Sequence, residues 1–130
     1  IDDYAHHPQE LEALIGGARK LFPGKKCTVV FQPHLYTRTR DFVDGFAEAL
    51  SLADEVYLLP IYPAREKPIE GVTSEMIAKK MQAVKVDCCS KEALMQKINA
   101  ASLDGKIEML ITAGAGDIDT MIGPLKALLQ

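Results

Sequence analysis

The chain has 130 residues, 48% of them hydrophobic and 25% charged, and its formal net charge is −3. This length fits a single domain over residues 1–130, large enough to bury a core without disulfides or a structural metal. The acidic balance argues against a nucleic-acid partner, and the apolar runs are too short to span a membrane.

The first half of the chain predicts a helix, a strand and a second helix. The first helix begins at His7-Pro8 and ends at Pro23-Gly24, because proline suits a first helical position and glycine often follows a helix end. Its buried stripe is expected to consist of Leu11, Leu14, Ile15, Ala18 and Phe22. A β-branched strand over 27–32 follows, and then a helix capped by Thr37 or Thr39. That helix would bury Phe42, Val43, Phe46, Ala47 and Leu50.

The second half continues the alternation, with strands expected over 56–60, 84–86 and 107–112. Thr73 or Ser74 would cap a short helix carrying Met76, Ile77 and Met81. Ser90 would cap a longer helix that buries Leu94, Met95 and Ile98. Gly114 and Gly116 would turn the chain into a last helix, kinked at Pro124, that buries Ile118, Met121, Ile122 and Leu125. Apolar strands between amphipathic helices predict a Rossmann-like, doubly wound α/β fold, with a mostly parallel sheet and helices on both faces.

Three cysteines, Cys27, Cys88 and Cys89, are predicted to be free thiols. Their number is odd, no C-x-x-C spacing occurs, and adjacent cysteines are a poor pair for a structural disulfide. The chain also starts with polar residues that do not resemble a signal peptide. These features predict a cytoplasmic protein.

Ligands of open α/β sheets bind beyond the carboxyl ends of the strands, and three segments meet that description. The first, Asp2–Pro8, brings two carboxylates, a phenol and two imidazoles to a helix start, where free N–H groups can hold an anion. Aspartate at a ribose and histidine at a phosphate are sensible roles, and a polar tail with a helix cap is the alternative. Because two adjacent histidines rarely reach one ion, no metal site is predicted.

The second segment, Gln32–Arg40, leads from a strand into a helix. Arg38 and Arg40 can form bidentate contacts to a carboxylate or phosphate, and a solvated basic helix start is an equal alternative. The third segment, Thr112–Ile118, has glycines that let the backbone approach a ligand. It lacks the third glycine of a dinucleotide fingerprint, and a tight turn capped by Asp117 is the stronger alternative. No phosphate-binding P-loop motif is present.

Taken together, these segments resemble the third, C-terminal domain of the Mur ligases. The resemblance rests on D-D-Y-A-H-H-P at 2–8, F-Q-P-H-L-Y-T-R-T-R-D-F at 31–42, L-A-D-E-V at 52–56, I-Y-P-A-R-E at 61–66 and G-A-G-D-I at 114–118. It covers essentially the whole chain. The Q-P-H-L-Y-T-R-T-R run is similar to that of the L-alanine-adding branch of the family. The related ligases that recycle murein tripeptide share the opening motif but would not be expected to carry this run.

The resemblance implies that the chain is one domain of a three-domain cytoplasmic enzyme of peptidoglycan synthesis. Such enzymes join L-alanine to UDP-N-acetylmuramate, using ATP and Mg²⁺, through an acyl phosphate on the muramate carboxyl group. The first domain holds the UDP sugar, the second carries the P-loop and the magnesium ligands, and the third closes over the site. The P-loop would then lie upstream of Ile1. The isolated chain would be inactive.

The resemblance also implies binding roles, without a certain catalytic residue. L-Alanine would be bound by His34, Arg38, Tyr4, His6 and Arg40, with Arg38 as the main carboxylate contact. ATP would be contacted by Asp3, Tyr4, His6, His7, Gly114, Gly116 and Asp117. Leu35 departs from relatives that place a second basic residue there, so carboxylate binding would depend more on Arg38 or Arg40.

Two other hypotheses stay open. The chain could be a free-standing α/β module that binds a nucleotide or an amino acid, which predicts ligand binding by the chain alone. It could also be a structural domain whose basic loop docks a partner, which predicts that Arg38→Ala leaves the activity of the longer enzyme unchanged.

Overall fold

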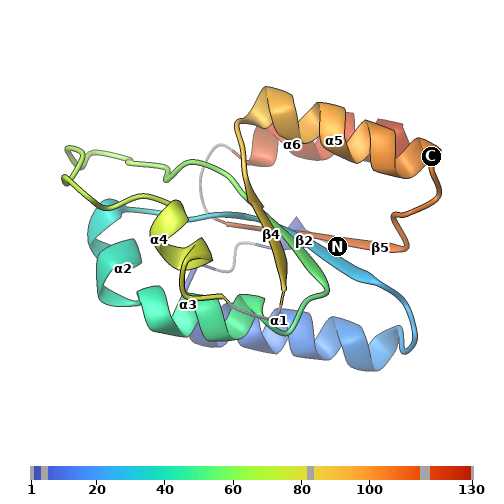
Figure 1. Cartoon of the computed structure of the whole chain (residues 1–130), viewed down its shortest axis with the longest axis horizontal. Helices are drawn as coiled ribbons and strands as arrows, with labels where there is room; N and C mark the ends of the chain where they lie inside the picture. The colour runs from blue at the N-terminus through green and yellow to red at the C-terminus, as the bar shows by residue number, and fades with distance from the viewer. Residues whose placement is uncertain (1, 4–5, 82–83, 115–117, 130) are drawn as a thin grey trace.

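The computed structural model describes residues 2–3, 6–81, 84–114 and 118–129. It contains a five-stranded parallel sheet with helices on both faces (Figure 1). The strands lie in the order β1-β5-β2-β3-β4. Their bounds are β1 Asp2–Asp3, β2 Cys27–Gln32, β3 Glu55–Leu58, β4 Lys85–Cys88 and β5 Met109–Gly114. Every pairing between them is parallel, which confirms the predicted Rossmann-like α/β fold.

The helices divide between the two faces of the sheet (Figure 1). One face is covered by α1 (Pro8–Leu21), α3 (Val43–Leu50) and α4 (Glu75–Ala78), and the other by α5 (Lys91–Leu103) and α6 (Asp119–Leu129). The short helix α2 (Tyr36–Asp41) follows the carboxyl end of β2. No helix of the described ranges is long and apolar enough to cross a membrane.

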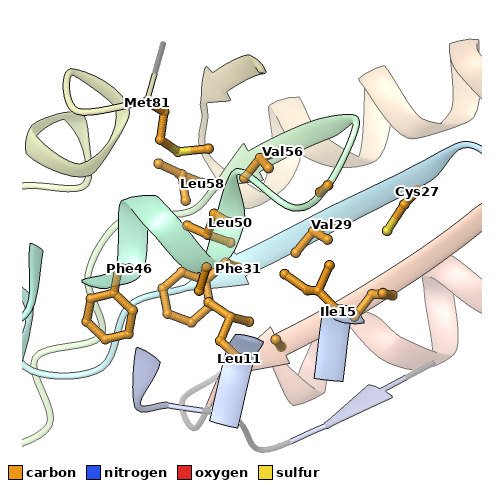
Figure 2. Close-up of a cluster of buried hydrophobic side chains, with 14 of the residues drawn as sticks. Leu11, Ile15, Cys27, Val29, Phe31, Phe46, Leu50, Val56, Leu58 and Met81 are labelled. Atoms are coloured by element: carbon orange, nitrogen blue, oxygen red, sulfur yellow. The ribbon is translucent and has the colours of Figure 1, made fainter. Parts of the chain in front are cut away.

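Two buried clusters hold these layers together, one on each face of the sheet. Because side chains alternate along a strand, Val29 and Phe31 of β2 face α1 and α3, whereas Val30 faces α5 and α6. Figure 2 shows the first cluster, where Phe31 and Phe46 meet with ring centroids 5.3 Å apart. Leu11 and Ile15 of α1 are fully buried against it. The predicted helical stripe and the predicted strand therefore form one core.

Two of the predicted core residues are wrong. Phe22 is 46% exposed and Phe42 is 45% exposed. Phe22 follows the last residue of α1, so it leaves the helical stripe. Phe42 separates α2 from α3 where one continuous helix was expected, and its ring packs against His7, with centroids 5.7 Å apart.

The strand expected over 107–112 is displaced along the chain. β5 runs from Met109 to Gly114, and its register pairs Gly114 with Gln32, the last residue of β2. Gly114 is therefore the end of a strand and not part of the turn that follows, which corrects the prediction. The strands expected over 27–32, 56–60 and 84–86 agree with β2, β3 and β4 to within two residues at each end, whereas the short strand β1 was not predicted.

The chain reverses its winding between β2 and β5, which are neighbours in the sheet. The helices that follow β2 lie on one face, and α6, which follows β5, lies on the other (Figure 1). In doubly wound sheets the crevice for ligands opens at such a switch point, outside the carboxyl ends of the two strands. The topology therefore places the candidate site at Gln32 and Gly114.

Candidate functional site

A buried glutamine joins the two strands at the switch point. Gln32 is 4% exposed, and its Oε1 atom accepts a hydrogen bond from the backbone N–H of Ile118 at 2.8 Å. This bond holds Ile118, the residue before α6, at the carboxyl end of β2. All three predicted segments meet here, because Asp3 pairs with Ala113 next to the Gln32–Gly114 pair.

Gly114 occupies a backbone position that no other residue fills without strain. Its φ is +141°, in the region that L side chains rarely adopt. A Cβ atom at Gly114 would lie 2.8 Å from the carbonyl oxygen of Gln32. The close approach of the two strand ends therefore requires glycine.

Aromatic and imidazole rings gather in front of these strand ends. The ring centroid of His6 lies 5.1 Å from that of His7 and 6.2 Å from that of His34. His34 in turn stacks on Tyr62 at 5.7 Å, with an interplanar angle of 13°. The N-terminal segment and the segment after β2 thus form one cluster, which the sequence motifs predicted only as separate pieces.

Arg38 joins this cluster through His34. Its Nη1 atom lies 3.1 Å from Nδ1 of His34, four residues earlier. A guanidinium only donates, so the Nδ1 atom of His34 accepts and its proton lies on Nε2. The other N–H groups of the Arg38 fork suit a planar anion such as a carboxylate.

Electrostatics favour this neutral form of His34. Burial lowers the pKa of the imidazole below its usual range, and the positive charge of Arg38 lowers it further. The interaction with His6 also lowers the pKa of His34, while the carboxylate of Glu66 raises it. At neutral pH, His34 therefore orients Arg38 without adding a second positive charge.

The predicted caps of α2 are wrong, because Thr37 and Thr39 lie inside the helix. The N-cap position is Leu35, whose side chain cannot accept a hydrogen bond. Glu66, about thirty residues later, accepts instead from the backbone N–H groups of Tyr36 and Thr37. Thr39 bonds back to Leu35, with its Oγ1 atom 2.8 Å from the carbonyl oxygen.

Not every predicted residue joins the cluster. Arg40 is exposed, and its Nε atom donates to Asp41 at 2.9 Å, so of the two arginines only Arg38 contacts His34. The structure describes Asp3 only through its backbone pairing. Tyr4, Gly116 and Asp117 lie outside the described residues.

Two cavities lie near the carboxyl ends of the central strands. The smaller, about 260 Å³, is lined by Gln32 and Tyr62 together with Ser90 at the start of α5. The larger, about 470 Å³, lies beyond β3 and β4, and Tyr36 of α2 contributes to its wall together with Cys88 and Cys89. Gln32 and Tyr62 therefore connect the smaller cavity to the ring cluster.

The described part of the chain holds no group of three or more His, Cys, Asp or Glu side chains that could bind a metal ion. The histidine cluster itself is organised by ring contacts and by the bond to Arg38.

Sequence reasoning missed two residues of this cluster. Tyr62 and Glu66 were quoted as part of a motif without a role, yet one stacks on His34 and the other caps α2. No local pattern could have assigned these contacts, because both join the loop after β3 to the segment after β2. The only signal was the position of I-Y-P-A-R-E beyond the end of a predicted strand.

A family model described as "Mur ligase, glutamate ligase domain" matches residues 1–116. Among curated proteins, the chain is 51% identical over 130 residues to a UDP-N-acetylmuramate–L-alanine ligase of Cytophaga hutchinsonii. It is 50% identical over 130 residues to the enzyme of the same name from Flavobacterium johnsoniae. Both matches cover 100% of this chain but only 27% and 28% of the relatives, so the chain spans about a quarter of their length.

Solved structures of ligases are also similar to this chain. The match to the UDP-N-acetylmuramate-alanine ligase of Thermotoga maritima covers 98% of this chain and 25% of the ligase chain, with a TM-score of 0.67 and 28% identity. The match to a murein peptide ligase from Psychrobacter arcticus covers 97% of this chain and 26% of the ligase chain, with a TM-score of 0.72. At 17% identity, the latter similarity supports the fold alone.

Proposed function

Because the family model matches residues 1–116, this chain belongs to the Mur ligase family, and we propose that it is the C-terminal domain of a longer L-alanine-adding ligase. That enzyme would join L-alanine to UDP-N-acetylmuramate with cleavage of ATP, in the synthesis of peptidoglycan precursors. The names of the relatives at 51% and 50% identity support this branch. The Q-P-H-L-Y-T-R-T-R run, which resembles that of the L-alanine-adding branch, is part of the same similarity.

The observation that carries the proposal is the His34–Arg38 pair at the switch point. Arg38 would bind the carboxylate of L-alanine through its guanidinium fork, while His34 keeps one N–H of that fork occupied and oriented. The amino group of alanine would then be free to face the acyl phosphate. The neutral amine would attack the acyl carbon, the bond from that carbon to the phosphate oxygen would break, and the nitrogen would lose a proton to solvent or to the released phosphate. The nearby positive charge would offset the developing negative charge.

The nucleotide would contact the N-terminal side of the same cluster. His6 and His7 lie at the entry to α1, and His6 is within 6.2 Å of His34 between ring centroids. Following the resemblance to the family, we propose that Asp3, Tyr4, Gly114, Gly116 and Asp117 also contribute to ATP binding. Bringing ATP and alanine to adjacent parts of one cluster would allow a closing domain to align the reactants.

The remaining parts of the reaction are assigned to the other two domains of the longer chain. They would hold the UDP sugar and most of the ATP–Mg²⁺, as the resemblance to the family implies. The isolated chain would then be inactive. We propose a cytoplasmic location for the enzyme, where the three free cysteines of this domain would stay reduced.

The test is ADP formation by the longer ligase that contains this chain, supplied with ATP–Mg²⁺ and UDP-N-acetylmuramate. The proposal predicts that L-alanine stimulates ADP release and is incorporated into the product. Glycine, L-glutamate and meso-diaminopimelate serve as competing acceptors. Equal or better incorporation of L-glutamate or meso-diaminopimelate would contradict the assignment to the L-alanine branch.

A further inference from the structure

The carboxylate of Glu66 holds the start of the helix that carries Arg38. Its Oε1 atom accepts hydrogen bonds from the N–H groups of Tyr36 at 2.6 Å and Thr37 at 3.1 Å. Its Oε2 atom accepts from the hydroxyl of Thr37 at 2.5 Å. The first N–H groups of a helix have no partner within the helix, so these bonds supply what the N-cap residue Leu35 cannot.

The chain enters this helix through a strained residue. Leu35 has a φ of 73°, which residues with a Cβ atom seldom adopt. Such a conformation persists only where the surroundings fix it. Here the N–H of Leu35 donates to the carbonyl of Tyr62 at 2.9 Å, and the N–H of Tyr62 donates to the carbonyl of Pro33 at 2.8 Å. The loop after β3 therefore holds both the entry to α2 and its first turn.

The same loop holds the partner of Arg38. Tyr62 stacks on His34, and His34 accepts from Arg38. Arg38 lies one residue beyond Thr37, which contacts Glu66 through both its backbone and its hydroxyl. A shift of the first turn of α2 would therefore move the guanidinium away from Nδ1 of His34. Two contacts from one loop, Tyr62 on the histidine and Glu66 on the helix, thus determine where the arginine fork points.

We infer that Glu66 is a positioning residue for the amino-acid substrate, acting through the first turn of α2 to orient Arg38 toward its carboxylate. This inference rests on the proposed function, since it takes L-alanine as the ligand of Arg38. Glu66 itself touches neither substrate nor nucleotide in this account. Its hydrogen bonds, that of the Thr37 hydroxyl first, lower the pKa of the carboxyl group, so it is ionised at neutral pH and accepts at both oxygens.

The experiment compares Glu66→Ala and Glu66→Gln in the longer ligase, with Glu70→Ala, an exposed glutamate of the same loop, as the control. Steady-state kinetics give KM for L-alanine and for ATP separately. Glu66→Ala is expected to raise KM for L-alanine roughly tenfold, the effect of losing one charge-assisted hydrogen bond between Arg38 and the substrate carboxylate, with KM for ATP changed less than roughly twofold. Glu66→Gln keeps an oxygen that accepts from the two N–H groups, so it should recover most of the affinity for L-alanine.

Hydrogen exchange separates the positioning of α2 from the identity of the substrate. In the wild type, the amides of Tyr36 and Thr37 should be protected, and Glu66→Ala should remove that protection while the amides of α5 stay protected. Unchanged protection, or equal rises of KM for both substrates in Glu66→Ala, would overturn the inference. If the wild-type ligase does not respond to L-alanine, the proposed function fails, whereas lost protection at Tyr36 and Thr37 would still support the action of Glu66 on α2.

Discussion

The guanidinium of Arg38 donates to the imidazole of His34, with Nη1 and Nδ1 3.1 Å apart. Since arginine has no acceptor, the bond exists only while Nδ1 of His34 carries no proton. A protonated His34 would turn its N–H toward the guanidinium and place two positive charges side by side. The arrangement of the site is therefore linked to the protonation of one histidine.

His34 should titrate below the ordinary histidine range, which is centred near pH ~6.5. Burial is the first cause and the charge of Arg38 the second, so Arg38→Ala should move the pKa of His34 upward without restoring it fully. The folded chain binds a proton at His34 less readily than the unfolded chain does. The contribution of neutral His34 to stability is therefore complete at pH values above the ordinary histidine range. That contribution is lost as the pH falls toward the folded pKa.

NMR titration of the imidazole measures this pKa directly, and ¹⁵N shifts report which nitrogen carries the proton. The control is Lys20→Ala, which removes an exposed positive charge near the end of α1. A pKa for His34 at or above the ordinary range would show that the bond to Arg38 is not formed in solution.

Replacing Gly114 with alanine should destabilise the fold. The new Cβ atom would meet the carbonyl of Gln32 at 2.8 Å, and the backbone at φ +141° would be strained in any case. We expect a loss of about 2–3 kcal/mol in the free energy of unfolding. Urea unfolding of the two chains measures it.

The matched control for this substitution is Gly17→Ala. Gly17 lies within α1, and an added Cβ there meets nothing within 4 Å. Alanine is the better helix former, so this variant should gain roughly 0.5–1 kcal/mol. If Gly114→Ala unfolded at the same urea concentration as the wild type, the close contact between β2 and β5 would be wrong.

The thiol of Cys88 should react slowly although it lines a cavity of about 470 Å³. Burial, followed by the negative charges of Glu75 and Asp87, raises its pKa to about 11. At pH ~8, roughly one thiol in a thousand would then be the reactive thiolate. Alkylation by iodoacetamide should therefore be at least roughly tenfold slower in the folded chain than in denaturing urea.

This rate can be followed by mass spectrometry in a Cys89→Ser background, which leaves Cys88 as the only thiol of its peptide. The unfolded chain provides the internal reference for the same residue. Labelling of the folded chain at the unfolded rate would show that Cys88 is an exposed, ordinary thiol and that the packing of β4 is different.

The parts of the fold that follow local periodicity could be predicted from the sequence. The apolar run over 27–32 forms β2, and Ser90 caps α5 by accepting from the N–H of Ala93 at 3.2 Å. In both cases the information lies within a few neighbouring residues. The alternation of strands and helices then leaves few topologies other than a parallel sheet.

The parts that failed depend on contacts between distant residues. Thr37 and Thr39 were expected to cap α2 because they are the nearest suitable residues, but the cap is Glu66, from another loop. The end of β5 was placed too early because its register is set by Gly114 pairing with Gln32. Family motifs brought His34 and Arg38 forward as candidates, whereas their mutual hydrogen bond required the structure.

The central claim, that Arg38 binds the carboxylate of L-alanine, is tested most directly by a cycle of two substrates and two enzymes. In the longer ligase, kcat/KM is measured for L-alanine and for L-alaninamide, which lacks the charged carboxylate. The account predicts that the wild type prefers L-alanine and that Arg38→Ala reduces this preference by about 2–4 kcal/mol, while Lys20→Ala leaves it intact. If Arg38→Ala lowered kcat/KM for both substrates equally, the preference would not depend on Arg38 and the claim would be contradicted.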